Sequence, residues 1–239
     1  MHKIGEVIEA STGEFTAQSY RLHWAPALGS LVKTGAPEPR VGEVHEPPLR
    51  AGSPAARVGE VHEPPLPAAH LEQIDQYTHQ VKTPAIYGVV CYSETVSLEP
   101  GRRAVARGRD LESEEDVYLQ NPQLARLLCT NFKALIVGYQ DGDRTCHFLP
   151  PRPPHVHAFV YPWSQEEVTA FTRSLDFLPL LLGTSLPIPA EELVAACLRA
   201  AAAARQDARA FLVGAGKELA LLLAAEPARL NTILRKIRP

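Results

Sequence analysis

The stretch that decides the fold extends from Lys133 to Trp163 and reads KALIVGYQDGDRTCHFLPPRPPHVHAFVYPW. Its first part is apolar, and Asp141 followed by Gly142 is typical of a type I′ turn, so a β-hairpin is predicted from Ala134 to Leu149. Four prolines then favour an extended chain, and we expect a further strand from His155 to Tyr161. The stretch divides the chain, because strands and loops are predicted before it and helices after it.

Short strands are predicted in the N-terminal part of the chain. Lys3–Ala10 and Glu14–Tyr20 contain β-branched and aromatic residues on either side of a turn, and a third strand is expected around Leu31. The run Ala85–Tyr92 is apolar without alternation, which is typical of a buried central strand. Arg103–Arg107 alternates and predicts one more strand. Together these segments predict a small β-barrel.

Four amphipathic helices are predicted after Trp163. A capping box formed by Ser164 and Glu167 begins the first, with an apolar stripe continuing to Leu178, and Pro189 and Pro227 begin the second and the fourth. The connections are short, so we expect a helical bundle. A further helix is expected earlier in the chain, where Asn121 is an N-cap followed by proline.

A proline-rich insert is predicted at about residues 35–68, where RVGEVHEPPL occurs twice, at 40–49 and at 57–66. Two copies are too few for a repeat architecture, and the prolines prevent regular strand pairing. We interpret the insert as a duplication within an exposed loop, which lengthens a loop at little entropic cost. His45 and His62 are then solvated, although a proline-rich docking motif remains an alternative.

Composition limits the compartment and the partners. The 239 residues carry a formal net charge of -3, which provides no overall attraction for nucleic acid or for an anionic membrane. The four cysteines form no CxxC pair and lie in apolar stretches, as expected in a reducing compartment. No apolar run reaches the roughly 18 residues that span a bilayer. We therefore expect a cytoplasmic protein with no membrane association.

Four residues of the central stretch could bind zinc: Cys146, His147, His155 and His157. On a strand, His155 and His157 would share one face, and Cys146 or His147 could approach from the hairpin. A metal-dependent hydrolase centred on Cys146, His155 and His157 is therefore an alternative function. The spacing is not that of a closed zinc motif, so exposed strand histidines are the other interpretation.

No complete catalytic motif is present in the chain. Gly214–Glu218 resembles the end of a phosphate-binding loop, but Phe211 stands where the first glycine belongs and Glu218 replaces the residue that binds magnesium. The basic residues near the C-terminus fit the solvated side of a helix. The sequence predicts no enzyme, no catalytic residue and no cofactor.

A nucleic-acid-binding module is a second alternative. In it, barrel strands would present aromatic side chains for stacking on bases, beside basic residues that contact phosphates. The candidates are Tyr20, Trp24 and Tyr92 for stacking, with Arg21 and Arg103 for charge.

The first 110 residues resemble the HAS-barrel, a small β-barrel found at the N-terminus of HerA-type DNA translocases. The matching segments are Ile4–Val7, Ser11–Phe15, the residues Pro26, Gly29 and Val32, and Tyr87–Val90. The resemblance implies a barrel that forms oligomers and docks partners without catalytic residues. The nucleotide-binding domain that follows the barrel in the translocases has no counterpart here, since a hairpin and helices follow instead.

We therefore expect an α+β protein with an N-terminal small β-barrel, a central β-hairpin layer and a C-terminal helical bundle. The expected domains are 1–110, which includes the insert, and 111–239. The leading function is a non-enzymatic adaptor or assembly module in a DNA-processing or ATPase machine. Its partner would be another protein or further copies of the same chain.

Overall fold

The structure is a computed structural model that describes residues 2–35, 84–99, 101 and 103–238. The chain divides into two units, and the larger one contains Met1–Ala36 and Pro84–Pro239. The duplicated segment, with His45 and His62, lies outside the described residues.

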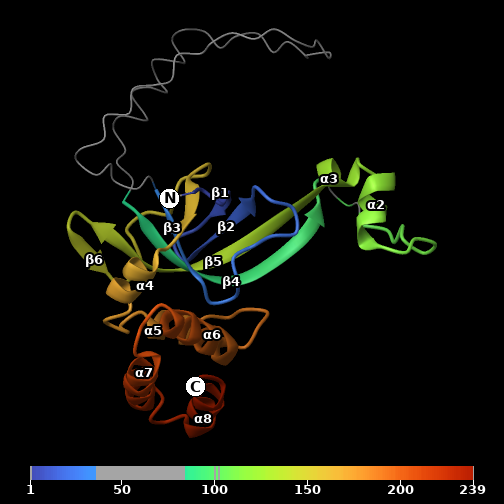
Figure 1. Cartoon of the computed structure of the whole chain (residues 1–239). Helices are drawn as coiled ribbons and strands as arrows, with labels where there is room; N and C mark the ends of the chain where they lie inside the picture. The colour runs from blue at the N-terminus through green and yellow to red at the C-terminus, as the bar shows by residue number, and fades with distance from the viewer. Residues whose placement is uncertain (1, 36–83, 100, 102, 239) are drawn as a thin grey trace, which may run out of the picture. The chain divides into compact units, whose positions relative to one another are not determined.

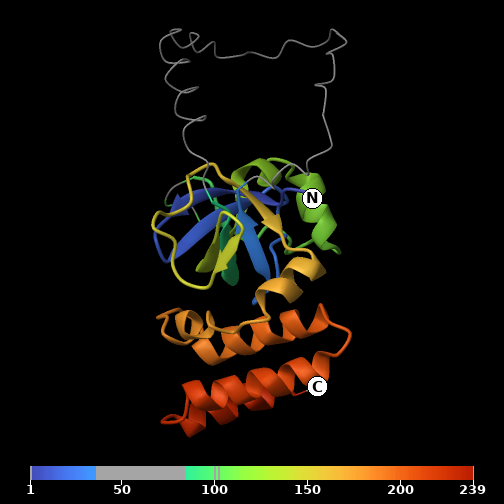
Figure 2. The ribbon, with the colours of Figure 1, turned by 90° about the vertical axis from the view of Figure 1, so that its left-hand side faces the viewer.

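Six antiparallel strands close into a barrel, so the predicted α+β class and the N-terminal β-barrel are confirmed (Figures 1 and 2). The order is β2-β1-β7-β3-β4-β5, and pairing between β2 and β5 closes the ring. The strands of the sheet are β1 (Gly5–Ala10), β2 (Glu14–Ser19), β3 (Leu31–Thr34), β4 (Ile86–Ser97), β5 (Leu128–Asp141), β6 (Arg144–Cys146) and β7 (Phe159–Pro162). Two of the six barrel strands, β5 and β7, come from beyond residue 110.

The barrel interior is filled by side chains from all six strands. Phe15 and Phe132 are the largest of them and are fully buried. Gly88 makes room for Phe15, because a Cβ atom at Gly88 would lie 3.0 Å from the Phe15 ring. The interior is therefore a packed core rather than a channel.

A second core lies between the outer face of the barrel and the helices that follow. Tyr87 and Val89 of β4 belong to this core, whereas Ile86 and Val90 belong to the barrel interior. Successive side chains of a strand point to opposite faces, and both faces of β4 are covered from Ile86 to Cys91. This explains why the run from residue 85 to 92 is apolar without alternation.

The helices of the C-terminal part are α4 (Gln165–Phe171), α5 (Leu178–Leu182), α6 (Ala190–Ala203), α7 (Ala208–Leu222) and α8 (Pro227–Lys236). The predicted capping box of Ser164 and Glu167 begins α4. The first helix is shorter than expected, because α4 ends at Phe171 and Leu178 starts α5. Helix α6 contacts α5, α7 and α8. None of the described helices combines the length and the apolarity needed to cross a membrane.

Strands β4 and β5 extend beyond the barrel as a two-stranded ribbon that ends at helices α2 (Glu114–Gln120) and α3 (Leu124–Leu127) (Figure 1). Two predictions for this region are wrong. Arg103–Arg107 forms no strand, and all five residues are exposed. The helix expected after Asn121 is present as α3, but its N-cap is Gln123, and Asn121 is instead the C-cap of α2. Helix α2 begins at the N-cap Ser113, whose side chain accepts from the backbone N–H of Asp116.

The predicted hairpin is present, and β5 pairs with β6 across a two-residue loop of Gly142 and Asp143. Because β5 is itself a barrel strand, the hairpin extends the barrel sheet and does not form a separate layer. The strand expected from His155 begins only at Phe159, in β7.

Candidate functional site

Cys146 and His147 lie at the contact between the hairpin and the helices. Cys146 is buried in β6. His147 Nε2 donates a hydrogen bond to the Phe171 carbonyl oxygen at 2.9 Å, and the two rings lie 4.4 Å apart. Two of the four predicted zinc ligands are therefore part of the packing between the hairpin and the helices: Cys146 is buried, and His147 is bonded to Phe171.

His155 and His157 are exposed and lie in a turn that precedes β7. The expectation that they share one face of a strand is wrong, because His157 has a φ of 71° and reverses the backbone. His157 Nδ1 lies 2.5 Å from Glu6 Oε1, on β1. Its hydrogen bond to Glu6 is the main reason why the pKa of that carboxyl is lowered.

The four predicted zinc ligands are thus held by different elements of the fold. Within residues 2–35, 84–99, 101 and 103–238, no group of three or more His, Cys, Asp or Glu side chains is arranged to hold a metal ion. A three-ligand zinc site needs its donors within about 2.3 Å of one point. The described geometry therefore provides no support for a hydrolase centred on Cys146, His155 and His157.

A cluster of aromatic rings connects the barrel to the helices. Trp163 lies nearly perpendicular to Tyr87 and to Phe171, with centroids 4.7 and 5.0 Å away, and Phe171 also contacts Phe177 and His147. Edge-to-face pairs contribute about 0.5–1.5 kcal/mol beyond their buried area. Residues 133–163 thus act as a joint between the two parts of the protein.

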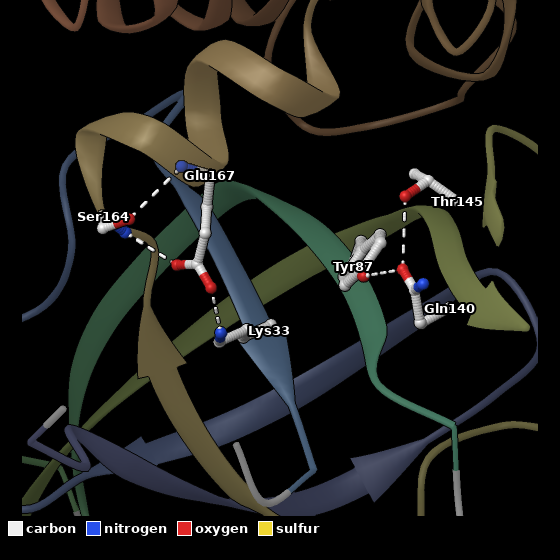
Figure 3. A network of polar contacts seen from close by, with 6 residues as sticks. All are labelled: Lys33, Tyr87, Gln140, Thr145, Ser164 and Glu167. Atoms are coloured by element: carbon white, nitrogen blue, oxygen red, sulfur yellow. Dashed lines mark hydrogen bonds and ion pairs between the residues drawn. The ribbon is translucent and has the colours of Figure 1, made fainter. Parts of the chain in front are cut away.

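Two groups of polar contacts flank this joint (Figure 3). Lys33 of β3 forms an ion pair with Glu167 of α4, whose other oxygen accepts from the backbone N–H of Ser164. In the second group, the Tyr87 hydroxyl donates to Gln140 Oε1 at 2.7 Å, as does Thr145 at 3.2 Å. These contacts orient α4 and the hairpin on the barrel.

Tyr87 is expected to make stability depend on alkaline pH. Burial raises the pKa of Tyr87 to about 12, and the Glu167 charge contributes to the rise. Because the unfolded chain loses this proton near pH 10 and the folded chain near pH 12, stability is full below pH 10 and falls above it, by up to about 3 kcal/mol. Urea unfolding at about pH 9 and about pH 11.5 should show a smaller loss in Tyr87→Phe than in the wild type. An equal loss in both proteins would contradict this prediction.

An apolar groove of about 540 Å³ lies where the barrel, β7, α4 and the end of α6 meet. Trp24 lies at this groove and is 36% exposed, Trp163 is half-buried, and small residues of α6 provide the room. The lining contains no charged side chain: Ile4, Trp24, Ala25, Pro26, Ala27, Ser30, Leu31, Val32, Pro162, Trp163, Gln165, Val168, Ala200, Ala203 and Ala204. Apolar, uncharged and open to solvent, this groove can receive an apolar side chain.

A polar pocket of about 390 Å³ lies on the other side of the loop formed by residues 25–27. His23, Ser93, Glu94, Thr95 and Thr130 line it together with this loop and Leu28. The backbone N–H of His23, a residue with a φ of 60°, donates to Thr130 Oγ1 at 2.7 Å, and its ring is bonded to Tyr118 of α2. The hydrogen bond from His23 to Thr130 therefore joins this loop to the β4–β5 ribbon beside the pocket.

Two of the aromatic candidates for nucleic-acid binding are hydrogen-bonded to carboxylates, and Lys3 Nζ lies 5.6 Å from the centroid of the Tyr20 ring. The hydroxyl of Tyr20 donates to Glu6 Oε2 at 3.1 Å, and that of Tyr92 donates to Glu94 Oε2 at 3.3 Å. Both carboxylates would repel a phosphate backbone. Trp24, the third candidate, belongs to the uncharged groove, and Arg21 and Arg103 are exposed.

The basic residues near the C-terminus are partly paired within the protein. Arg229 bonds to Glu191 of α6 and, at 2.9 Å, to Glu226, while Lys236 Nζ lies 2.5 Å from Glu192. Its bond to Arg229 lowers the pKa of Glu191. Gly214–Glu218 lies within α7, so the segment resembling a phosphate-binding loop is helical.

Sequence reasoning missed the groove and the polar pocket, because each is assembled from segments distant in the sequence. One local signal was present: five alanines occupy positions 200–204 at the end of α6, and small residues permit close approach. Comparisons with protein-family models and with curated proteins give no match.

Proposed function

We propose that this protein is a non-enzymatic adaptor that docks a protein partner through the apolar groove beside Trp24. The observation that carries the proposal is the groove itself: about 540 Å³ of space with no charged residue in its lining. Binding sites are commonly concave and lined mainly by apolar side chains, with volumes of about 300–1,000 Å³. The absence of a complete catalytic motif from the sequence is consistent with a docking role.

Trp24 is well placed to be the main contact of the interface. It is 36% exposed, so a partner can still cover much of its ring. Tryptophan is enriched among the few residues that carry most of the binding energy of an interface. The indole adds a polar N–H to a large apolar surface, which suits an interface that is wet at its rim.

The partner is expected to insert one large apolar side chain into the groove. Trp163, Leu31 and Val168 form apolar walls, and an inserted charge would find no counter-charge in the lining. A second copy of this chain is the alternative partner, which sedimentation measurements distinguish from a different protein.

Trp24→Ala is expected to weaken partner binding by about 2 kcal/mol, or roughly thirtyfold, because truncation removes a large apolar contact. Ala203→Phe should have a similar effect for the opposite reason, since a new ring fills the groove. Partner capture from native extract with each variant would be followed by titration of the purified partner. Phe148→Ala, at an exposed aromatic residue outside the groove, is the matched control.

The result that supports the proposal is one partner retained by the wild type and by Phe148→Ala and lost from both groove variants. Unfolding measurements on each variant separate a lost site from a lost fold. A monomeric wild-type protein with no partner, or a partner that both groove variants retain, would contradict the proposal.

A further inference from the structure

We propose that the free edge of β4, from Tyr92 to Ser97, is a second docking site that adds an extended, basic segment of a partner protein as a further β-strand. The site is distinct from the apolar groove, and either one can exist without the other.

One edge of this segment lacks a strand neighbour among the described residues. On one side, β4 pairs with β5 as far as Ser97. On the other, β3 pairs only with Tyr87–Val89, and Gly29 and Ser30 bond to the backbone of Val90. Within the described residues, no further backbone hydrogen bond reaches that edge. An unpaired edge presents a row of N–H and C=O groups that can pair with another chain.

A pocket near the edge can receive a side chain of the added strand. The polar pocket of about 390 Å³ lies between Ser93–Thr95 and the loop of residues 25–28. The segment is exposed at Tyr92–Thr95 and half-buried at Val96 and Ser97. Peptide recognition by strand addition combines backbone hydrogen bonds with pockets for alternate side chains. Here the edge provides the backbone groups, and the polar pocket can hold a side chain.

The charge of this surface indicates the chemistry of the added strand. Glu94 and Asn131 are direct partners in the β4–β5 ladder, so their side chains lie on the same face. Asn131 Oδ1 is buried and has no hydrogen-bond partner within the described residues. Glu94 accepts a hydrogen bond from the Tyr92 hydroxyl and forms no ion pair with any of the described residues. The exposed Glu94 carboxylate thus offers an acceptor that a lysine or arginine of the added strand would satisfy, whereas Asn131 Oδ1 is buried on the next strand.

The basic residue opposite Tyr92 already forms an ion pair within the protein. Lys133, the ladder partner of Tyr92, lies 2.8 Å from Glu14, and the hydrogen bond to Glu14 raises the pKa of Lys133. A second copy of this chain would bring another Glu94 to the same edge, and like charges across a sheet are unfavourable. These charges favour a basic segment of a different protein.

The test uses a fluorescent peptide of about ten residues that alternates threonine and valine around one lysine, a length typical of strands. Fluorescence anisotropy with the full chain should detect binding. Glu94→Lys should weaken it about tenfold or more and should favour a second peptide in which glutamate replaces the lysine. The matched control is Glu218→Lys, the same charge change at an exposed position of α7, which should leave binding unchanged.

Two N-methylated forms of the lysine peptide test for pairing through the backbone. Each form carries methyl groups on alternate amides and so blocks one edge of the peptide strand, and only one form should lose binding. The proposal is overturned if the lysine peptide does not bind, if Glu94→Lys binds it equally well, or if the two methylated forms behave alike. A disulfide between two copies carrying Ser97→Cys would show that a second copy occupies the edge, which also overturns it.

Discussion

Gly29→Ala is expected to destabilise the protein by about 3 kcal/mol or more. Gly29 has a φ of 81°, a conformation that costs a residue with a Cβ atom roughly 1–2 kcal/mol. A Cβ atom at this position would also lie 2.4 Å from the backbone carbon of Ala196 and from the nitrogen of Cys197. Because both atoms belong to the backbone of α6, the helix itself would have to move.

Denaturant unfolding followed by circular dichroism measures this loss. Gly214→Ala is the matched control, since a Cβ atom there meets nothing within 4 Å and Gly214 lies inside α7. It should be neutral or stabilising by up to about 1 kcal/mol, because alanine favours a helix more than glycine does. Equal changes in the free energy of unfolding would show that the close packing of Gly29 against α6 does not require a glycine.

Phe171→Ala is expected to cost about 3–5 kcal/mol, as for other large aromatic residues removed from a core. Phe171 is 3% exposed and its ring contacts Tyr87, Trp163 and Phe177, so the cavity would lie at the joint between barrel and helices. The shared core also predicts that the barrel and the helices unfold together.

Calorimetry of the wild type and of Phe171→Ala tests both statements. One transition is expected in each, at a lower temperature in the variant. Phe148→Ala is again the control, because this ring is 52% exposed and its loss should change stability by less than about 1 kcal/mol. Separate transitions for strands and helices in the wild type would contradict a shared core and would support two domains.

Local signals predicted the features that depend on neighbouring residues. The capping box at Ser164 and the proline that begins α8 act within one helical turn, and the hairpin after β5 depends on one turn. The strand expected at His155 was wrong for the opposite reason. The backbone there follows contacts with β1, including the bond from the His157 N–H to the Val7 carbonyl oxygen.

Distant contacts decided where the candidate sites lie. The groove combines residues near 25 with residues near 163 and 200, and the polar pocket combines His23 with Thr130. No period or motif in the chain connects these segments. The predicted zinc residues lie close together in the sequence, but Cys146 is buried in β6, and His147 and His157 bond to Phe171 and to Glu6 instead.

By itself, the sequence from Lys133 to Trp163 determined that strands precede helices and that β5 turns back into β6. The apolar run from Ala85 to Tyr92 indicated that β4 is buried on both faces there. Hydrophobic pattern and turn residues are local properties, and they suffice for those features. Only the tertiary structure decided that β7 inserts between β1 and β3, that β2 closes on β5, and that β3 pairs with β4 only at Tyr87–Val89. Strand pairing joins residues far apart in the chain, so its partners are selected by how the whole barrel packs.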